Sequence, residues 1–166
     1  MVQYISMKKA IFTASLLLIA AACAKQTVTI PTIYDYSHKL AVGNQLLMVE
    51  IVQSPEKMAT GLSGRENMGS NEGMLFDFAG QAPSNLYFWM KDMKFNLDLI
   101  WINKNKIIGI TANVPVPVNC ESLTVKCSLP AYFPPSQVDM VLEVNAGWAQ
   151  GNNVKVGDEV IFFDKN

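Results

Sequence analysis

Hydrophobic and polar residues alternate along several short stretches of the chain, and this period of two predicts β-strands. The first two stretches, residues 39–42 and 45–52, are separated by Gly43-Asn44. This dipeptide suits a type II′ hairpin turn because glycine comes first. A second hairpin is expected where Asn103-Lys104-Asn105 joins two apolar stretches. The remaining strands are expected at 73–78, 85–91, 97–102, 106–110, 138–144 and 159–163.

Two short helices are expected among the strands. Ser54-Pro55-Glu56 is typical of a helix start, because serine caps the first turn, proline fits it and glutamate favours its positive end. A second helix of one or two turns is expected at 146–151. The pattern therefore predicts a mainly β (α+β) fold over residues 39–164, a small single-domain β-barrel or sandwich with one or two short helices.

The chain begins with the features of an export signal. Two lysines precede Ala10 to Ala22, an uncharged run that is too short to span a bilayer comfortably. We therefore interpret residues 1–22 as a signal peptide, with translation starting at Met1 or Met7. Residues 23–38 are expected to form a tether to the folded domain.

Cys23 directly follows the apolar run, and this junction resembles a bacterial lipobox. The resemblance implies a lipidated Cys23. Because Ala24 rather than an aspartate follows, it also implies a lipoprotein on the periplasmic face of the outer membrane. Ordinary cleavage after the small residues Ala20 and Ala22 is the alternative, and it would yield a soluble periplasmic or secreted protein.

The composition supports a folded core, because half of the residues are hydrophobic and only 16% are charged. Without Lys8 and Lys9 the 13 basic residues become 11 against 14 acidic ones, a net charge of −3. The lysines are dispersed and form no basic patch, so nucleic acid is not an expected partner. We expect a monomer without a cofactor or a metal.

Two further cysteines lie in a proline-rich excursion over residues 111–135. In an oxidising compartment we expect Cys120 and Cys127 to form a disulfide that closes this loop. Chain entropy alone would make such a bridge worth roughly 2.5 kcal/mol. A redox or metal-binding thiol pair is the alternative, but the gap of six residues differs from the two-residue gap of those motifs.

Arg65, the only arginine of the chain, is expected to lie near Trp89, Lys91 and Asp98. Such a cluster would form a binding site, because arginine offers a planar fork of donors, tryptophan a stacking face and lysine a second positive charge. In the structural alternative, Arg65 pairs with Asp98 and Trp89 packs over the guanidinium. Strand alternation in 85–91 puts Trp89 and Lys91 on the face away from the core.

Five blocks of sequence, in their order and spacing, resemble one family. They are Gly61-Leu62-Ser63-Gly64-Arg65, Gly73-Met74-Leu75-Phe76, Phe88-Trp89-Met90-Lys91, Leu97-Asp98-Leu99-Ile100, and Val141 to Gly147 with Val156-Gly157-Asp158. The chain resembles the domain of unknown function 192 (DUF192) family from about Leu46 to Phe163, and its exported lipoprotein-type members in particular. The resemblance implies a small, mainly β domain, and it implies no reaction.

Catalysis has little support in the residues. His38 is the only histidine, which argues against a Ser-His-Asp triad and against zinc held by histidines. We therefore expect a non-enzymatic envelope protein that binds a small anionic ligand or a partner protein. The alternatives are a hydrolase of an envelope polymer that uses Asp92, Asp98 and Arg65, a copper site at Met90 and Met93, and a structural or assembly factor without a ligand.

Overall fold

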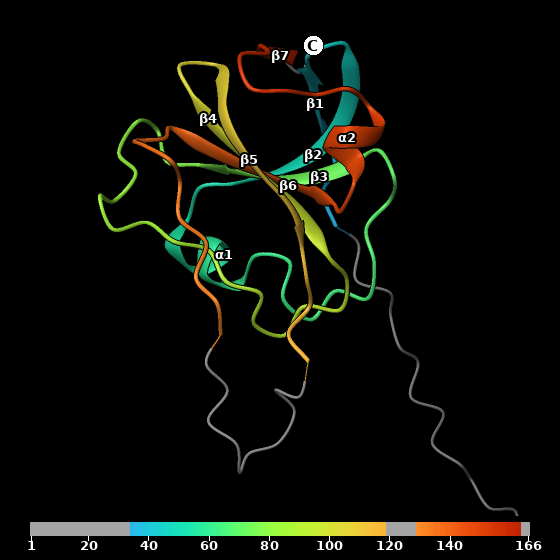
Figure 1. The fold of residues 1–166 in the computed structure, drawn as a ribbon, viewed down its shortest axis with the longest axis vertical. Coiled ribbons are helices and arrows are strands. Elements are labelled where there is room, and N and C mark those ends of the chain that lie inside the picture. The colour runs from blue at the N-terminus through green and yellow to red at the C-terminus, as the bar shows by residue number, and fades with distance from the viewer. Residues whose placement is uncertain (1–33, 119–128, 164–166) are drawn as a thin grey trace, which may run out of the picture. The chain divides into compact units, whose positions relative to one another are not determined.

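The short alternating stretches pair into one β-sheet (Figure 1). The computed structural model describes residues 34–118 and 129–163. The strands of this part of the chain are β1 (His38–Val42), β2 (Gln45–Val52), β3 (Glu72–Asp77), β4 (Leu97–Asn103), β5 (Lys106–Val114), β6 (Met140–Asn145) and β7 (Val160–Phe163). Two short helices accompany them, α1 (Pro55–Thr60) and α2 (Trp148–Gly151).

The sheet has the order β5-β4-β6-β3-β2-β1-β7, and only β2 and β3 among its neighbours run parallel. The two ends of the sheet approach each other. The Ile107 amide donates to the Asp158 carbonyl over 3.0 Å, and the Val160 amide donates to the Asn105 carbonyl over 2.9 Å. The sheet therefore curls into half a barrel, which confirms the predicted mainly β class. Figure 1 shows the β4–β5 hairpin and β7 at the same end of the sheet.

The curl gives the sheet an inner and an outer face, because alternate residues of a strand point to opposite sides. The inner face is filled by apolar side chains of the strands and of α2, including Leu40, Leu47, Leu75, Ile100, Leu142 and Trp148. The outer face carries a second apolar layer that includes Val52, Phe76, Trp101 and Val141 and is covered by Leu62 and Met90. Each such buried side chain contributes about 1.5–3 kcal/mol, so both faces stabilise the sheet.

The predicted strand at 85–91 is wrong, whereas the other predicted strands and both helices are present near their expected bounds. Phe88 forms one isolated bridge with Tyr132, and the chain then turns where the Met93 amide donates to the Met90 carbonyl. Burial still alternates as predicted, since Met90 is buried and Trp89 is 47% exposed. The residues therefore have the strand pattern, but no neighbouring strand extends the ladder.

Several predictions fall on residues that the structure does not describe. They are the signal peptide at 1–22, lipidation of Cys23 and the disulfide between Cys120 and Cys127, and all three stay predictions. Within the described part of the chain, no helix is long and apolar enough to cross a membrane.

Asp98 is a fully buried carboxylate that joins three parts of the fold. It lies on the inner face of β4, where the register of β4 against β5 shifts. Its oxygens accept hydrogen bonds from the backbone amides of Asn113 at 2.8 Å, Gly147 at 3.1 Å and Ala149 at 3.0 Å. Asp98 therefore ties β5 and the start of α2 to β4.

We predict that Asp98→Ala lowers the free energy of unfolding by at least about 3 kcal/mol, because three buried amides lose their acceptor. Asp98→Asn should cost less, since its amide oxygen can still accept from two of the three donors. Chemical denaturation measures both losses, and Glu66→Ala, at an exposed acid, is the control. An Asp98→Ala protein as stable as the control would contradict this structural role.

Candidate functional site

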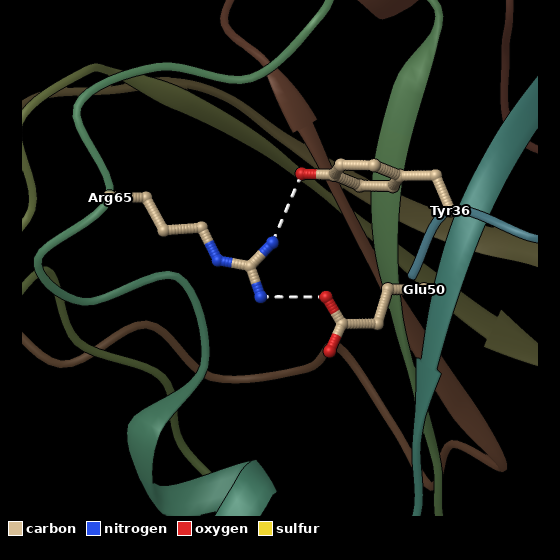
Figure 2. A network of polar contacts seen from close by, with 3 residues as sticks. All are labelled: Tyr36, Glu50 and Arg65. Atoms are coloured by element: carbon tan, nitrogen blue, oxygen red, sulfur yellow. Dashed lines mark hydrogen bonds and ion pairs between the residues drawn. The ribbon is translucent and has the colours of Figure 1, made fainter. Parts of the chain in front are cut away.

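Arg65 forms the only salt bridge among residues 34–118 and 129–163. The loop after α1 positions it, because its amide donates to the Leu62 carbonyl over 3.1 Å. Its guanidinium lies 2.7 Å from the Glu50 carboxylate and donates to the Tyr36 hydroxyl over 3.0 Å (Figure 2). Arg65 is 7% exposed and the Glu50 side chain 12%, so the pair is shielded from water and from salt.

Two tyrosines of the predicted tether complete this cluster. The Arg65 Cζ atom lies 3.7 Å from the centre of the Tyr34 ring, a cation–π contact, and 5.9 Å from that of Tyr36. Burial raises the pKa of Tyr36, and the neighbouring Arg65 opposes that rise. The end of the predicted tether is therefore packed onto the loop after α1 and onto β2.

The structure does not form the predicted pair between Arg65 and Asp98. Asp98 points to the inner face of the sheet, whereas Arg65 reaches Glu50 on the outer face, so the sheet separates them. The structural alternative was therefore wrong in both partners, because Arg65 pairs with Glu50 and stacks on Tyr34. Because Asp98 is fully buried, it is not available to a substrate of the hydrolase that we considered.

Trp89 and Lys91 lie apart from the Arg65 cluster. Trp89 is 47% exposed, and Lys91 is exposed, with its Nζ atom 6.0 Å from the centre of the Trp89 ring. Such an exposed cation–π contact contributes about 0.5–1 kcal/mol at most. Of the four predicted site residues, the structure therefore brings together only these two.

Glu143 is a buried carboxyl group in the middle of the outer face. It lies on β6 between Met74 of β3 and Leu99 of β4, and Glu50 lies beyond Met74 on β2. It is 5% exposed, and its carboxyl group has no hydrogen-bond or ionic partner among the described residues. Burial raises the pKa of Glu143 to about 8, with Arg65 lowering it in part, so the group is mainly protonated at neutral pH.

A cavity of about 230 Å³ lies over Glu143. Its apolar lining comes from the α1 region, from β3 and from the segment after it, and consists of Met58, Ala59, Gly61, Leu62, Phe76, Phe78, Leu86, Phe88 and Met93. Thr60 and Ser63 add hydroxyl groups, and Glu143 adds the single carboxyl group of the lining. Tyr87 and Trp89 line the cavity where it meets solvent, since each is about half exposed.

A second cavity, of about 270 Å³, shares Thr60 and Gly61 with the first and is lined by Arg65 and Glu50. Of its four charged lining residues, Arg65 and Glu50 already pair with each other at 2.7 Å. Among the described residues no group of three or more His, Cys, Asp and Glu side chains is placed to hold a metal ion. The cavity over Glu143 is therefore the better candidate site.

Sequence reasoning missed Glu50 and Glu143 as site residues. Each is a lone acid at a position where strand alternation leads to the sheet face that α1 covers, and Glu143 stands between Leu142 and Val144 in an otherwise apolar strand. An acid in such a strand is a signal of a buried carboxyl group. The sequence pattern alone could not show that the α1 region covers the outer face of the sheet, to which Glu143 points.

Comparison with known proteins agrees with this fold. The profile of the DUF192 family, described as an uncharacterised ACR, matches residues 38–162. The chain therefore belongs to the DUF192 family, whose function is uncharacterised. No functionally curated protein matches the chain.

Two crystal structures are similar to this one. A Sinorhizobium meliloti 1021 protein, described as a candidate transcription regulator, is 28% identical with a TM-score of 0.60, over 75% of this chain and 91% of its own. A protein of unknown function from Novosphingobium aromaticivorans DSM 12444 is 24% identical with a TM-score of 0.62, over 81% of this chain and 94% of its own. At 24% identity, the similarity to the second protein shows a shared fold and carries no argument about function.

We predict that the free energy of unfolding falls as the pH rises from about 5 to about 8. The folded protein keeps the Glu143 proton up to a pKa of about 8, whereas the unfolded chain loses it near the ordinary value of 4.5. The folded state therefore binds more protons in this window, and its stability is fully present below the window and lost as the pH rises through it. The full loss is on the order of 5 kcal/mol.

Glu143→Gln removes the titrating group and keeps its shape. Denaturation of both proteins over this pH range isolates the contribution of Glu143, because the other groups titrate alike in both. Parallel stability curves for the two proteins would show that the Glu143 pKa is not raised.

Proposed function

We propose that this protein is a non-enzymatic binding domain whose small ligand occupies the cavity over Glu143. One observation carries the proposal: a buried carboxyl group, without a partner among the described residues, faces an apolar cavity. The Glu143 carboxyl group opens on the cavity. A ligand in the cavity can therefore form the hydrogen bond that no described residue forms with this group.

The size of the cavity supports a ligand with few atoms. An apolar cavity of about 150 Å³ is large enough to hold benzene. A volume of about 230 Å³ therefore suits an aromatic or branched aliphatic group with one short polar substituent. Tyr87 and Trp89 provide half-exposed rings at the opening, which suits the entry of an apolar molecule from water.

The chemistry of the lining supports binding rather than hydrolysis. Acid–base hydrolysis by carboxyl groups uses a pair of them on either side of the bond that is cleaved. Glu143 is the single carboxyl group of the lining, and Asp98, which we had considered for this role, is buried on the opposite face. Ser63 is no activated nucleophile, since its hydroxyl donates to the Lys91 carbonyl over 2.8 Å.

We predict that benzyl alcohol, a probe of suitable size, binds in this cavity and shifts the backbone amide resonances of α1, Phe88 and Glu143. Ala59→Trp, an exposed lining position, should weaken binding at least about tenfold by filling the space, a loss of about 1.4 kcal/mol. An NMR titration of the amides measures both effects.

The matched control is Glu56→Trp, which places the same side chain on α1 beside the second cavity. It should bind the probe like the unsubstituted protein. The proposed site would be rejected if Ala59→Trp bound benzyl alcohol as tightly as the unsubstituted protein does. It would also be rejected if the resonance shifts were confined to residues away from the cavity.

We also propose that the protein is exported and held at the envelope by a lipid on Cys23. The support is the sequence of residues 1–23, in which a basic start, an apolar run and a small-residue junction precede a cysteine. The ligand would then be taken up outside the cytoplasm.

For the anchor we predict that Cys23→Ser moves most of the protein from the membrane fraction to the soluble fraction when the full chain is expressed in a two-membrane bacterium. Loss of the acyl chains removes about 0.8 kcal/mol of membrane affinity for each buried methylene. Ala24→Ser, at the next position, is the control and should stay with the membranes. Unchanged membrane association of Cys23→Ser would reject the anchor.

A further inference from the structure

We propose that the ligand of this cavity is a small apolar amine, bound as its ammonium ion to Glu143, and that binding releases the Glu143 proton. This inference rests on the proposed function and names the chemical class of the ligand. The sequence predicted an anionic ligand at Arg65 and Lys91. The proposed ligand is a cation instead, because neither of these residues lines this cavity.

Two hydroxyl groups of the lining, on Thr60 and Ser63, are acceptors toward a ligand. The Thr60 hydroxyl donates to the Glu56 carbonyl over 3.0 Å, and the Ser63 hydroxyl donates to the Lys91 carbonyl over 2.8 Å. With their protons engaged, both hydroxyl oxygens present only lone pairs to a further partner. The backbone amides of Gly61 and Ser63 are also engaged within the loop. A ligand with several N–H donors therefore finds acceptors in these two hydroxyl groups and in the ionised Glu143 carboxylate.

The charges on the outer face leave Glu143 without a counterion. Glu50 and Glu143 lie on either side of Met74, and Arg65 pairs with Glu50 at 2.7 Å. Arg65 lowers the pKa of Glu143 but does not offset its burial. A ligand ammonium would supply the missing positive charge, and a carboxylate with a charged donor forms the stronger class of hydrogen bond.

The aromatic rings that line the cavity suit a cation as well. Phe76 and Phe88 meet edge to face, with ring centres 4.9 Å apart and planes at 85°. Tyr87 and Trp89 meet in the same way at 6.1 Å. The faces of such rings carry partial negative charge and attract a cation within about 6 Å. The sulfur atoms of Met58 and Met93 add polarisable contacts for the apolar part of the ligand.

The proton balance follows from the state of Glu143. The neutral carboxylic acid and a ligand ammonium ion form a carboxylate–ammonium pair, and one proton passes to the solvent. Arg65 acts on Glu143 from the loop after α1. The cross-strand neighbours of Glu143, Met74 on β3 and Leu99 on β4, are uncharged. In the covering segment Lys91 and Asp92 are exposed.

Two more acids lie on β3, which pairs with β6, and on β2, one strand further away. Glu72 of β3, two residues before Met74, accepts from the Gly69 amide at 2.8 Å. Glu50 of β2 is already paired with Arg65. Because both carboxylates have partners, Glu143 is the group that changes its charge when an ammonium ion binds.

The test compares benzylamine with benzyl alcohol, two probes of nearly equal shape, by calorimetric titration of the full chain at about pH 7. Benzylamine should bind at least about tenfold more tightly, which is about 1.4 kcal/mol. Titrations in phosphate and in Tris, whose ionisation enthalpies differ, count the released protons, and the count should approach one.

Glu143→Gln should lose this preference for benzylamine and the proton release, because it has no carboxyl group to ionise. A second measurement needs no variant: the affinity of the unsubstituted protein for benzylamine should rise nearly tenfold per pH unit from about pH 6 to about pH 7.5. Its affinity for benzyl alcohol should not rise over the same range.

The outcomes separate the two proposals. Equal or tighter binding of benzyl alcohol, or benzylamine binding without proton release, would overturn the amine and leave the cavity as the site of a neutral ligand. Failure of both probes to bind would overturn the proposed function itself.

Discussion

The outer face of the sheet depends on one guanidinium group. Arg65 joins β2 through Glu50 and the segment before β1 through Tyr34 and Tyr36, while its own backbone closes the loop after α1. A buried ion pair costs desolvation energy that its attraction offsets only when the geometry is good. The short contact to Glu50 and the stacked tyrosine ring provide such geometry. Removing Arg65 would leave a carboxylate shielded from water and would free the loop that borders the cavity.

The same pairing decides the chemistry of Glu143. On the outer face Glu50 and Glu143 lie two strands apart. Arg65 forms its salt bridge with Glu50. Burial of the other then favours the neutral acid, because a charge is poorly solvated among apolar side chains. The cavity above it is lined by aromatic rings, methionines and hydroxyl oxygens. The proposed binding in this cavity can therefore be tested residue by residue.

The sequence predicted the strands correctly where the burial of side chains alone sets both the residue pattern and the structure. Strands β1, β2, β4 and β6 were expected near their true positions because a pleated strand buries every second side chain. Burial alternates as expected even at Phe88 to Lys91. The strand predicted there was wrong because a strand also needs a neighbour for its backbone hydrogen bonds. Phe88 meets Tyr132 at one bridge only, and a pattern within seven residues carries no information about that partner.

The sequence by itself determined the mainly β class, the short helices, the membership of a family and the burial of Met90. These follow from the period of hydrophobic residues and from short motifs. The tertiary structure alone decided the partners of the charged residues. Arg65 contacts Glu50 rather than Asp98 because the curled sheet puts Asp98 on its inner face, and Glu143 lies under a cavity because the α1 region covers its strand. Strand register and the side to which a loop folds are set by contacts between distant residues, so spacing along the chain could not predict them.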